Sequence, residues 1–160
     1  SPNGTSLSAL RHEVGPLLVY LLSFANIAIY WNNHHHLLRR TERISTGVMW
    51  ANMALLFALS LVPVATDWLG RSYTHTLPAA AYGVVAIMAA IAYYALTRTI
   101  IRANPDSPMA ESIGSDVKGL LSLVMYGGGV ALSFVTPYLA IGMYVLVALT
   151  WFVPDRRLAR

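Results

Sequence analysis

The chain has 160 residues, of which 56% are hydrophobic and 11% are charged, with a net charge of +4 and no cysteine. Soluble globular domains carry roughly 25% charged residues, so this composition is typical of an integral membrane protein. The lack of cysteine excludes disulfides, thiolate metal sites and cysteine nucleophiles. In a membrane protein, the excess of arginine reflects loop charge and orientation and does not indicate a nucleic-acid partner.

Residues 16–36 form the first predicted membrane helix, because about 20 apolar residues at roughly 1.5 Å rise span the roughly 30 Å hydrocarbon core. Polar side chains recur along it at helical period and share one face: Ser23, Asn26, Tyr30 and Asn33. Amide side chains are costly in hydrocarbon. We therefore expect this face to contact protein or a water-filled cavity instead of lipid.

Four further membrane helices are predicted, over residues 46–66, 77–101, 117–134 and 136–153. Ser45 is expected to cap the first of them, and Pro63 is expected to kink it near its end. Small residues at the start of the 77–101 helix permit close helix contacts. The predicted fold class is all-α, a polytopic membrane helical bundle with five transmembrane helices. Residues 1–160 form a single transmembrane domain.

The connections of this bundle are predicted to be short, apart from the polar loop over residues 102–116. Residues 67–76 are expected to form a second loop, and the last two helices are expected to form a tight antiparallel hairpin. Gly127, Gly128 and Gly129 lie inside the fourth helix. They fit either a hinge used in gating or close helix packing, and packing is the favoured interpretation.

Basic residues alternate between the connections. Three lie within residues 39–43, three accompany the 102–116 loop if Arg98 is counted with it, and three follow the last helix, whereas the other connections hold one or none. The positive-inside rule then places the C-terminus in the cytoplasm and the N-terminus outside. An N-terminus outside the cell has to be carried across the membrane, and no signal-peptide pattern is visible. One more helix upstream is the simplest explanation of how it gets there, and a cleaved signal peptide is the alternative.

The consecutive histidines His34, His35 and His36 raise the possibility of a metal site, since imidazole is a common metal ligand. Neighbouring helical residues point about 100° apart, so these three cannot converge on one ion. Helical metal sites place their ligands three or four residues apart. The plainer interpretation places His34 on the protein-facing stripe and His35 or His36 at the interface. A histidine-using membrane haem or metal protein, or an enzyme of that kind, remains the alternative.

Three segments carry a family resemblance: YLLSFANIAIYWNNHHHLLRR, VMWANMALLFALSLVPVATDWLG and AAYGVVAIMAAIAYYAL. They resemble the transmembrane protein 175 family, which comprises lysosomal potassium channels and smaller prokaryotic relatives. The likeness extends over essentially the whole chain and is most specific at residues 31–36, 50–52 and 61–63. It implies a six-helix subunit that assembles as a tetramer. The family's F-S-D sequence, which belongs to a pore-lining first helix, does not occur here, so we expect helices two to six of such a subunit.

The resemblance implies a subunit of a potassium-selective channel that conducts passively across a prokaryotic cell membrane. Potassium is then the permeant ion of a homotetramer in the bilayer, and no cofactor, enzymatic activity or nucleic-acid partner is expected. The resemblance also places Trp31 and His34 in a hydrogen-bonded network with the first-helix motif. Asn26, Asn33 and Asn52 join them as the predicted structural network behind the pore, because such amides are more often interhelical hydrogen-bond partners than the lining of a hydrated path.

Overall fold

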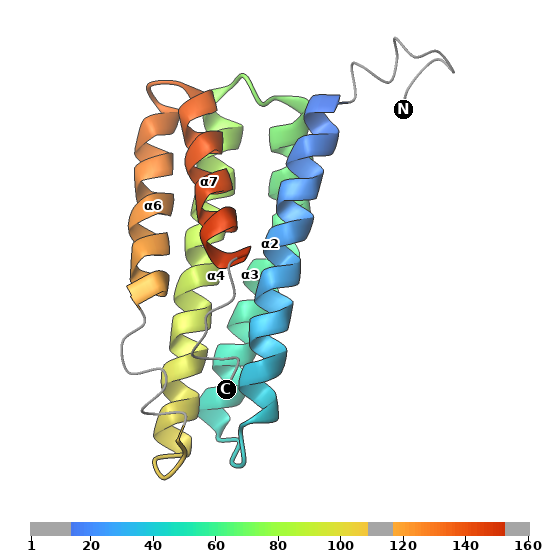
Figure 1. Cartoon of the computed structure of the whole chain (residues 1–160). Helices are drawn as coiled ribbons and strands as arrows, with labels where there is room; N and C mark the ends of the chain where they lie inside the picture. The colour runs from blue at the N-terminus through green and yellow to red at the C-terminus, as the bar shows by residue number, and fades with distance from the viewer. Residues whose placement is uncertain (1–13, 109–116, 153–160) are drawn as a thin grey trace, which may run out of the picture.

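The structure is a computed structural model that describes residues 14–108 and 117–152. It contains the helices α2 (Val14–Arg39), α3 (Thr46–Arg71), α4 (Thr76–Ala103), α6 (Val117–Ser133) and α7 (Pro137–Phe152). Within these residues no strand occurs, so the all-α prediction is confirmed. The helices form an upright bundle in which α2 and α6 stand on opposite sides (Figure 1).

The described parts of the helices fall into two groups by length. α2, α3 and α4 have 26, 26 and 28 residues and are long and apolar enough to cross a membrane. α6 and α7 are apolar too, but they have only 17 and 16 residues. At about 1.5 Å per residue these two measure roughly 25 Å, which is less than α4 by about 15 Å. The lower part of α4 therefore extends beyond the described ends of both (Figure 1).

The end of α3 corrects one prediction. α3 begins where expected, with the Ser45 hydroxyl accepting from the Val48 N–H at 3.3 Å. It runs through Pro63 and continues to Arg71, whereas a loop was predicted from residue 67. The last turn is held by an ion pair in which Arg71 Nε lies 2.8 Å from Asp67 Oδ1, a spacing of four residues that stabilises a helix. Arg98 lies inside α4, as the predicted 77–101 helix requires.

α4 is the central helix, because it packs against α3, α6 and α7. Its buried face carries small residues at a helical spacing: Ala79, Gly83, Ala86, Ala89 and Ala92. These residues allow the close approach of neighbouring helices that replaces the hydrophobic effect as a packing force in lipid. The predicted close packing by small residues is confirmed here.

The α6–α7 hairpin turns over residues 134–136, where the N–H of Thr136 donates to the carbonyl of Leu132 at 2.9 Å. The three glycines of α6 differ in their surroundings. A Cβ at Gly129 would meet the ring of Tyr144, and one at Gly128 would touch Met143 at 3.6 Å, whereas one at Gly127 would meet nothing within 4 Å. Close packing, the favoured interpretation, therefore holds for Gly129 and not for Gly127.

Gly83 and Gly127 provide a matched test of this packing. A Cβ at Gly83 would collide with the hydroxyl of Tyr144 and lie 2.6 Å from Val130 Cγ2, so Gly83→Ala should destabilise the α4–α6–α7 contact by about 1–3 kcal/mol. Gly127→Ala should be neutral or stabilising by up to about 1 kcal/mol, since it only raises helix propensity. Thermal unfolding of the purified protein in detergent measures both. Equal midpoints for the two variants would contradict the packing.

Candidate functional site

The polar stripe of α2 faces the interior of the bundle, as the sequence predicts. Ser23 and Asn26 are buried, with 3% and 9% of their surface exposed, while Tyr30 and Asn33 are half-buried. α2 packs along α3 and reaches α4 through side chains. Its contacts lie at several positions along the helix axis, termed here heights and taken from the N-terminal end of α2 to its C-terminal end. At each height α2 contacts different residues.

Tyr82 of α4 is the partner at the first height. Its hydroxyl accepts hydrogen bonds from Ser23 Oγ at 3.2 Å and from Asn26 Nδ2 at 3.0 Å. Thr66 of α3 donates to the carbonyl of Val62 at 2.6 Å, and its Oγ1 also lies 2.6 Å from Ser23 Oγ. Side chains of α2, α3 and α4 thus meet in one buried group of hydrogen bonds, which satisfies polar atoms that lipid could not.

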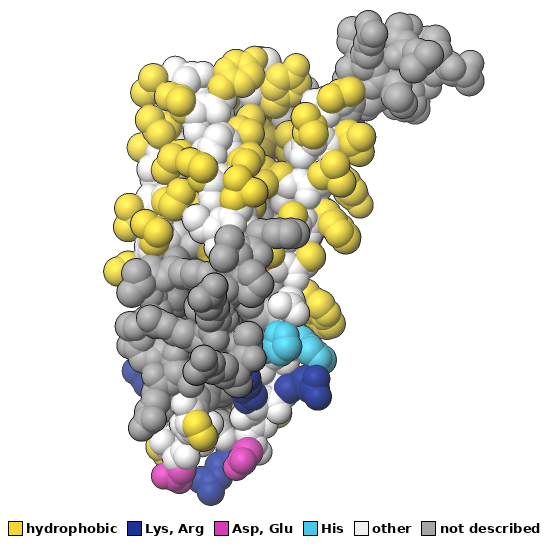
Figure 2. Space-filling model, viewed as in Figure 1, with side chains coloured by type: hydrophobic (Ala, Val, Ile, Leu, Met, Phe, Trp, Pro, Cys, Tyr) yellow, Lys and Arg dark blue, Asp and Glu magenta, His cyan; other side chains and the backbone are white. Residues whose placement is uncertain are grey.

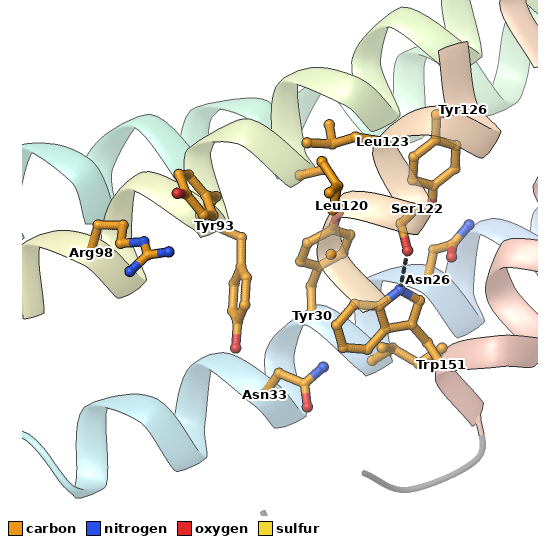
Figure 3. Close-up of a pocket in the computed structure, with 14 residues that line it drawn as sticks. Asn26, Tyr30, Asn33, Tyr93, Arg98, Leu120, Ser122, Leu123, Tyr126 and Trp151 are labelled. Carbon is orange, nitrogen blue, oxygen red and sulfur yellow. Dashed lines mark hydrogen bonds between the residues drawn. The ribbon is translucent and has the colours of Figure 1, made fainter. Parts of the chain in front are cut away.

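The middle height contains aromatic side chains and a cavity. The rings of Tyr30 and Tyr93 lie edge to face, with their centroids 6.0 Å apart. Beside them lies a cavity of about 520 Å³ between α2, α4, α6 and α7, termed here the interhelix cavity, whose lining includes Asn33, Tyr93 and Arg98 (Figure 3). Trp151 and Ser122 also line the cavity, and the indole N–H of Trp151 donates to Ser122 Oγ at 2.6 Å.

The third height joins α2 to α3. His34 is buried, with 7% of its surface exposed, and its Nε2 lies 2.6 Å from Asn52 Oδ1. Because a carbonyl oxygen only accepts, His34 Nε2 is the donor in this arrangement. The ring of Trp31 stacks on the His34 ring at a centroid distance of 5.9 Å, although 61% of the Trp31 surface remains exposed. The predicted residues Trp31, His34 and Asn52 are therefore neighbours.

Two of the five predicted network residues lie elsewhere. Asn26 binds Tyr82, and it precedes His34 by eight residues, which is about 12 Å along a helix. Asn33 lines the interhelix cavity. The five residues thus occupy three places along α2 and α3. The sequence places Asn26, Asn33 and His34 on the protein-facing stripe of one helix and Asn52 on the next helix, but it gives no partner for each.

A fourth contact was not predicted from the sequence. Asn104 follows the end of α4, is buried, and binds the backbone of Arg43 twice. Its Oδ1 accepts from the Arg43 N–H at 2.8 Å, and its Nδ2 donates to the Arg43 carbonyl at 3.0 Å. This amide holds the α2–α3 turn against α4. The Asn-Pro pair at residues 104–105 indicates a turn, but nothing in it indicates a partner 61 residues away.

The remaining histidines of the run do not form a metal site with their neighbours. His35 and His36 are exposed, and their rings contact each other edge to face with centroids 6.1 Å apart. Within residues 14–108 and 117–152, no group of three or more His, Cys, Asp or Glu side chains is arranged to hold a metal ion. The described part of the chain therefore gives no support to the haem or metal alternative.

Comparison with known proteins places this arrangement in a family. The profile described as "Endosomal/lysosomal potassium channel TMEM175" matches residues 1–63. A potassium channel from a Chryseobacterium species is 44% identical over 160 residues, which cover 99% of this chain and 83% of the relative. The chain belongs to the TMEM175 potassium-channel family. A potassium channel of Streptomyces collinus is 30% identical over 162 residues, which cover 92% of this chain and 78% of that relative. No solved structure matches the chain.

The TMEM175 profile covers only part of the contacts described above. Trp31, His34 and Asn52 lie within its 63 matched residues, whereas Tyr82 and Asn104 lie beyond them. The Chryseobacterium relative, in contrast, aligns over nearly the whole chain. The family assignment therefore includes α4, α6 and α7 as well as the α2–α3 pair.

His34→Ala tests whether the His34–Asn52 contact stabilises this TMEM175 subunit. The substitution removes a buried imidazole and leaves the half-buried amide oxygen of Asn52 without this partner, which should cost about 1–3 kcal/mol of stability. His35→Ala, one residue along and exposed, is the control and should change stability by less than about 0.5 kcal/mol.

A double-mutant cycle with Asn52→Ala measures the contact itself. Thermal unfolding in detergent and size-exclusion chromatography report on folding and assembly. If His34→Ala matched the wild type in both while a bound metal was lost, His34 would be a ligand and not a structural partner.

Proposed function

We propose that this chain is a subunit of a potassium channel that conducts passively and forms a homotetramer in the cell membrane. The observation that carries the proposal is the 44% identity, over 99% of the chain, to a protein named as a potassium channel. The three long apolar helices fit a membrane location. We further propose that the chain catalyses no reaction and binds no cofactor, so that potassium is a permeant ion only.

We also propose that the pore is lined by a helix other than the five described. No run resembling T-V-G-Y-G, the carbonyl filter of other potassium channels, occurs in the sequence. α2 offers a surface for such a helix. In its most apolar stretch of 18 residues only 11% of the residues are buried, against 33% and 44% in the corresponding stretches of α3 and α4. Large apolar side chains cover its outer side: Leu17, Leu18, Leu21, Phe24 and Trp31. We propose that a pore helix packs against this side, with α2 as its scaffold.

Potassium flux into liposomes tests the proposed function. The full-length protein, reconstituted into vesicles loaded with potassium chloride, should release potassium down its gradient when a proton carrier balances the charge, and release should be slower with sodium. The segment from residue 1 to 160 alone should pass little, because the pore lining is proposed to lie outside it. Selective flux from this segment would move the filter into the described helices, and no flux from either protein would contradict the channel assignment.

The orientation of the subunit is proposed from its charge distribution. Basic side chains gather at the lower end of the bundle in Figure 2, where the α2–α3 turn and the end of α4 lie. At the opposite end Arg71 is neutralised by Asp67. By the positive-inside rule we propose that the lower end, and with it the C-terminus, faces the cytoplasm.

Cysteine labelling tests this orientation in the cysteine-free background of the chain. Ser72→Cys lies in the α3–α4 turn and Ser107→Cys lies after α4, at opposite ends of the bundle. A membrane-impermeant maleimide applied to intact cells should label position 72 and should label position 107 only after lysis. The reverse pattern would invert the orientation, and labelling of both from outside would contradict the membrane crossing of α4.

A further inference from the structure

The interhelix cavity is large enough to hold a small molecule. Its volume of about 520 Å³ falls within the roughly 300–1,000 Å³ of small-molecule sites in proteins. On α4 its lining runs from Ala90 to Arg98 and on α2 from Asn26 to Asn33. These eight- and seven-residue steps correspond to about 12 and 10 Å along the helices. The cavity is therefore elongated parallel to the helix axes.

Most of the cavity wall is apolar. Ile29, Ala90, Leu120 and Leu123 contribute to it together with the rings of Tyr126 and Trp151. Ordered water in a buried site needs two to four polar partners. No buried side-chain nitrogen or oxygen among the described residues lacks a hydrogen-bond partner, so none of them requires water from this space. A hydrocarbon chain fits such a wall better, because it supplies the dispersion contacts that an empty cavity lacks.

The lower end of the cavity carries a positive charge. Arg98 lies five residues before the end of α4 and is half-buried. Its guanidinium carbon lies 5.0 Å from the centre of the Tyr94 ring. Among the described residues no Asp or Glu lies within ion-pair distance of Arg98. The ion pair found among these residues joins Arg71 to Asp67. A guanidinium withdrawn from water gains from an anionic partner, and its planar fork matches phosphate and carboxylate oxygens.

We propose that the interhelix cavity binds one acyl chain of an anionic membrane phospholipid, with its phosphate at Arg98. The mostly apolar wall, the axial elongation and the charge at the end nearer the α2–α3 turn match the layout of such a lipid in the leaflet on that side. The site lies between α2 and the α4–α6–α7 group. A bound lipid would fill the space that Tyr30 and Tyr93 bridge, and would add contacts between α2 and the rest of the bundle.

Native mass spectrometry of the purified full-length protein tests the site directly, independently of conduction. Protein in detergent is mixed with phosphatidylglycerol or with phosphatidylcholine of identical acyl chains. We expect phosphatidylglycerol to be retained about tenfold more strongly, as a charge-assisted hydrogen bond allows. Arg98→Gln should abolish this preference. Arg102→Gln, four residues further along α4 and exposed, is the matched control and should preserve it.

A second pair of variants tests the acyl chain and guards against misfolding. Ala90→Leu adds volume inside the cavity and should reduce retention of both lipids by about tenfold, whereas Ala95→Leu, on the exposed side of α4, should not. Unfolding midpoints measured without lipid show whether each variant is folded. Retention unchanged in both Arg98→Gln and Ala90→Leu overturns the proposal. So does equal retention of the two lipids by the wild type, or uptake of oleate in place of phosphatidylglycerol.

Discussion

The hydroxyl of Tyr82 is the contact that connects the two sides of the bundle. On one side it accepts hydrogen bonds from Ser23 and Asn26, which fix the rotation of α2 about its axis. On the other side the Tyr82 ring lies 5.3 Å from the ring of Tyr144, whose hydroxyl donates to a backbone carbonyl of α4. Gly83, the next residue, leaves the room that Tyr144 occupies. One tyrosine and the adjacent glycine therefore set both the position of α2 and the closeness of α7.

The membrane explains why these contacts are polar. In hydrocarbon an unpaired polar group costs several kcal/mol, so each must find a partner within the protein. The chain does this at separate heights, with Thr66 beside Ser23, Asn52 opposite His34, and Asn104 on the backbone of Arg43. Each pair joins two different elements. Polar residues thus specify which helix faces which, a choice that apolar packing alone leaves open because lipid tails are as apolar as leucine.

The sequence was sufficient to predict the helices and the inner face of α2, because both follow from local periodicity. The Ser45 cap and the packing role of the α4 small residues were predicted for the same reason. The end of α3 was predicted wrongly: residues 67–76 were expected to form a loop, whereas the Asp67–Arg71 pair favours another helical turn. The partners of Asn26 and Arg43 could not be predicted, because Tyr82 and Asn104 are 56 and 61 residues distant. A single sequence carries no signal for such pairs.

The uneven surroundings of α2 constrain how the subunit can transmit movement. Its inner side is fixed by hydrogen bonds at Tyr82 and Asn52, and the turn after it is fixed at Asn104. A displacement of α2 against α3 and α4 would leave several buried groups without partners, at about 1–3 kcal/mol each. Over its first half the outer side carries large apolar side chains such as Leu21 and Phe24, whose contacts can slide without losing hydrogen bonds. The three long helices are therefore expected to move as one unit, and relative motion is easiest across the outer side of α2.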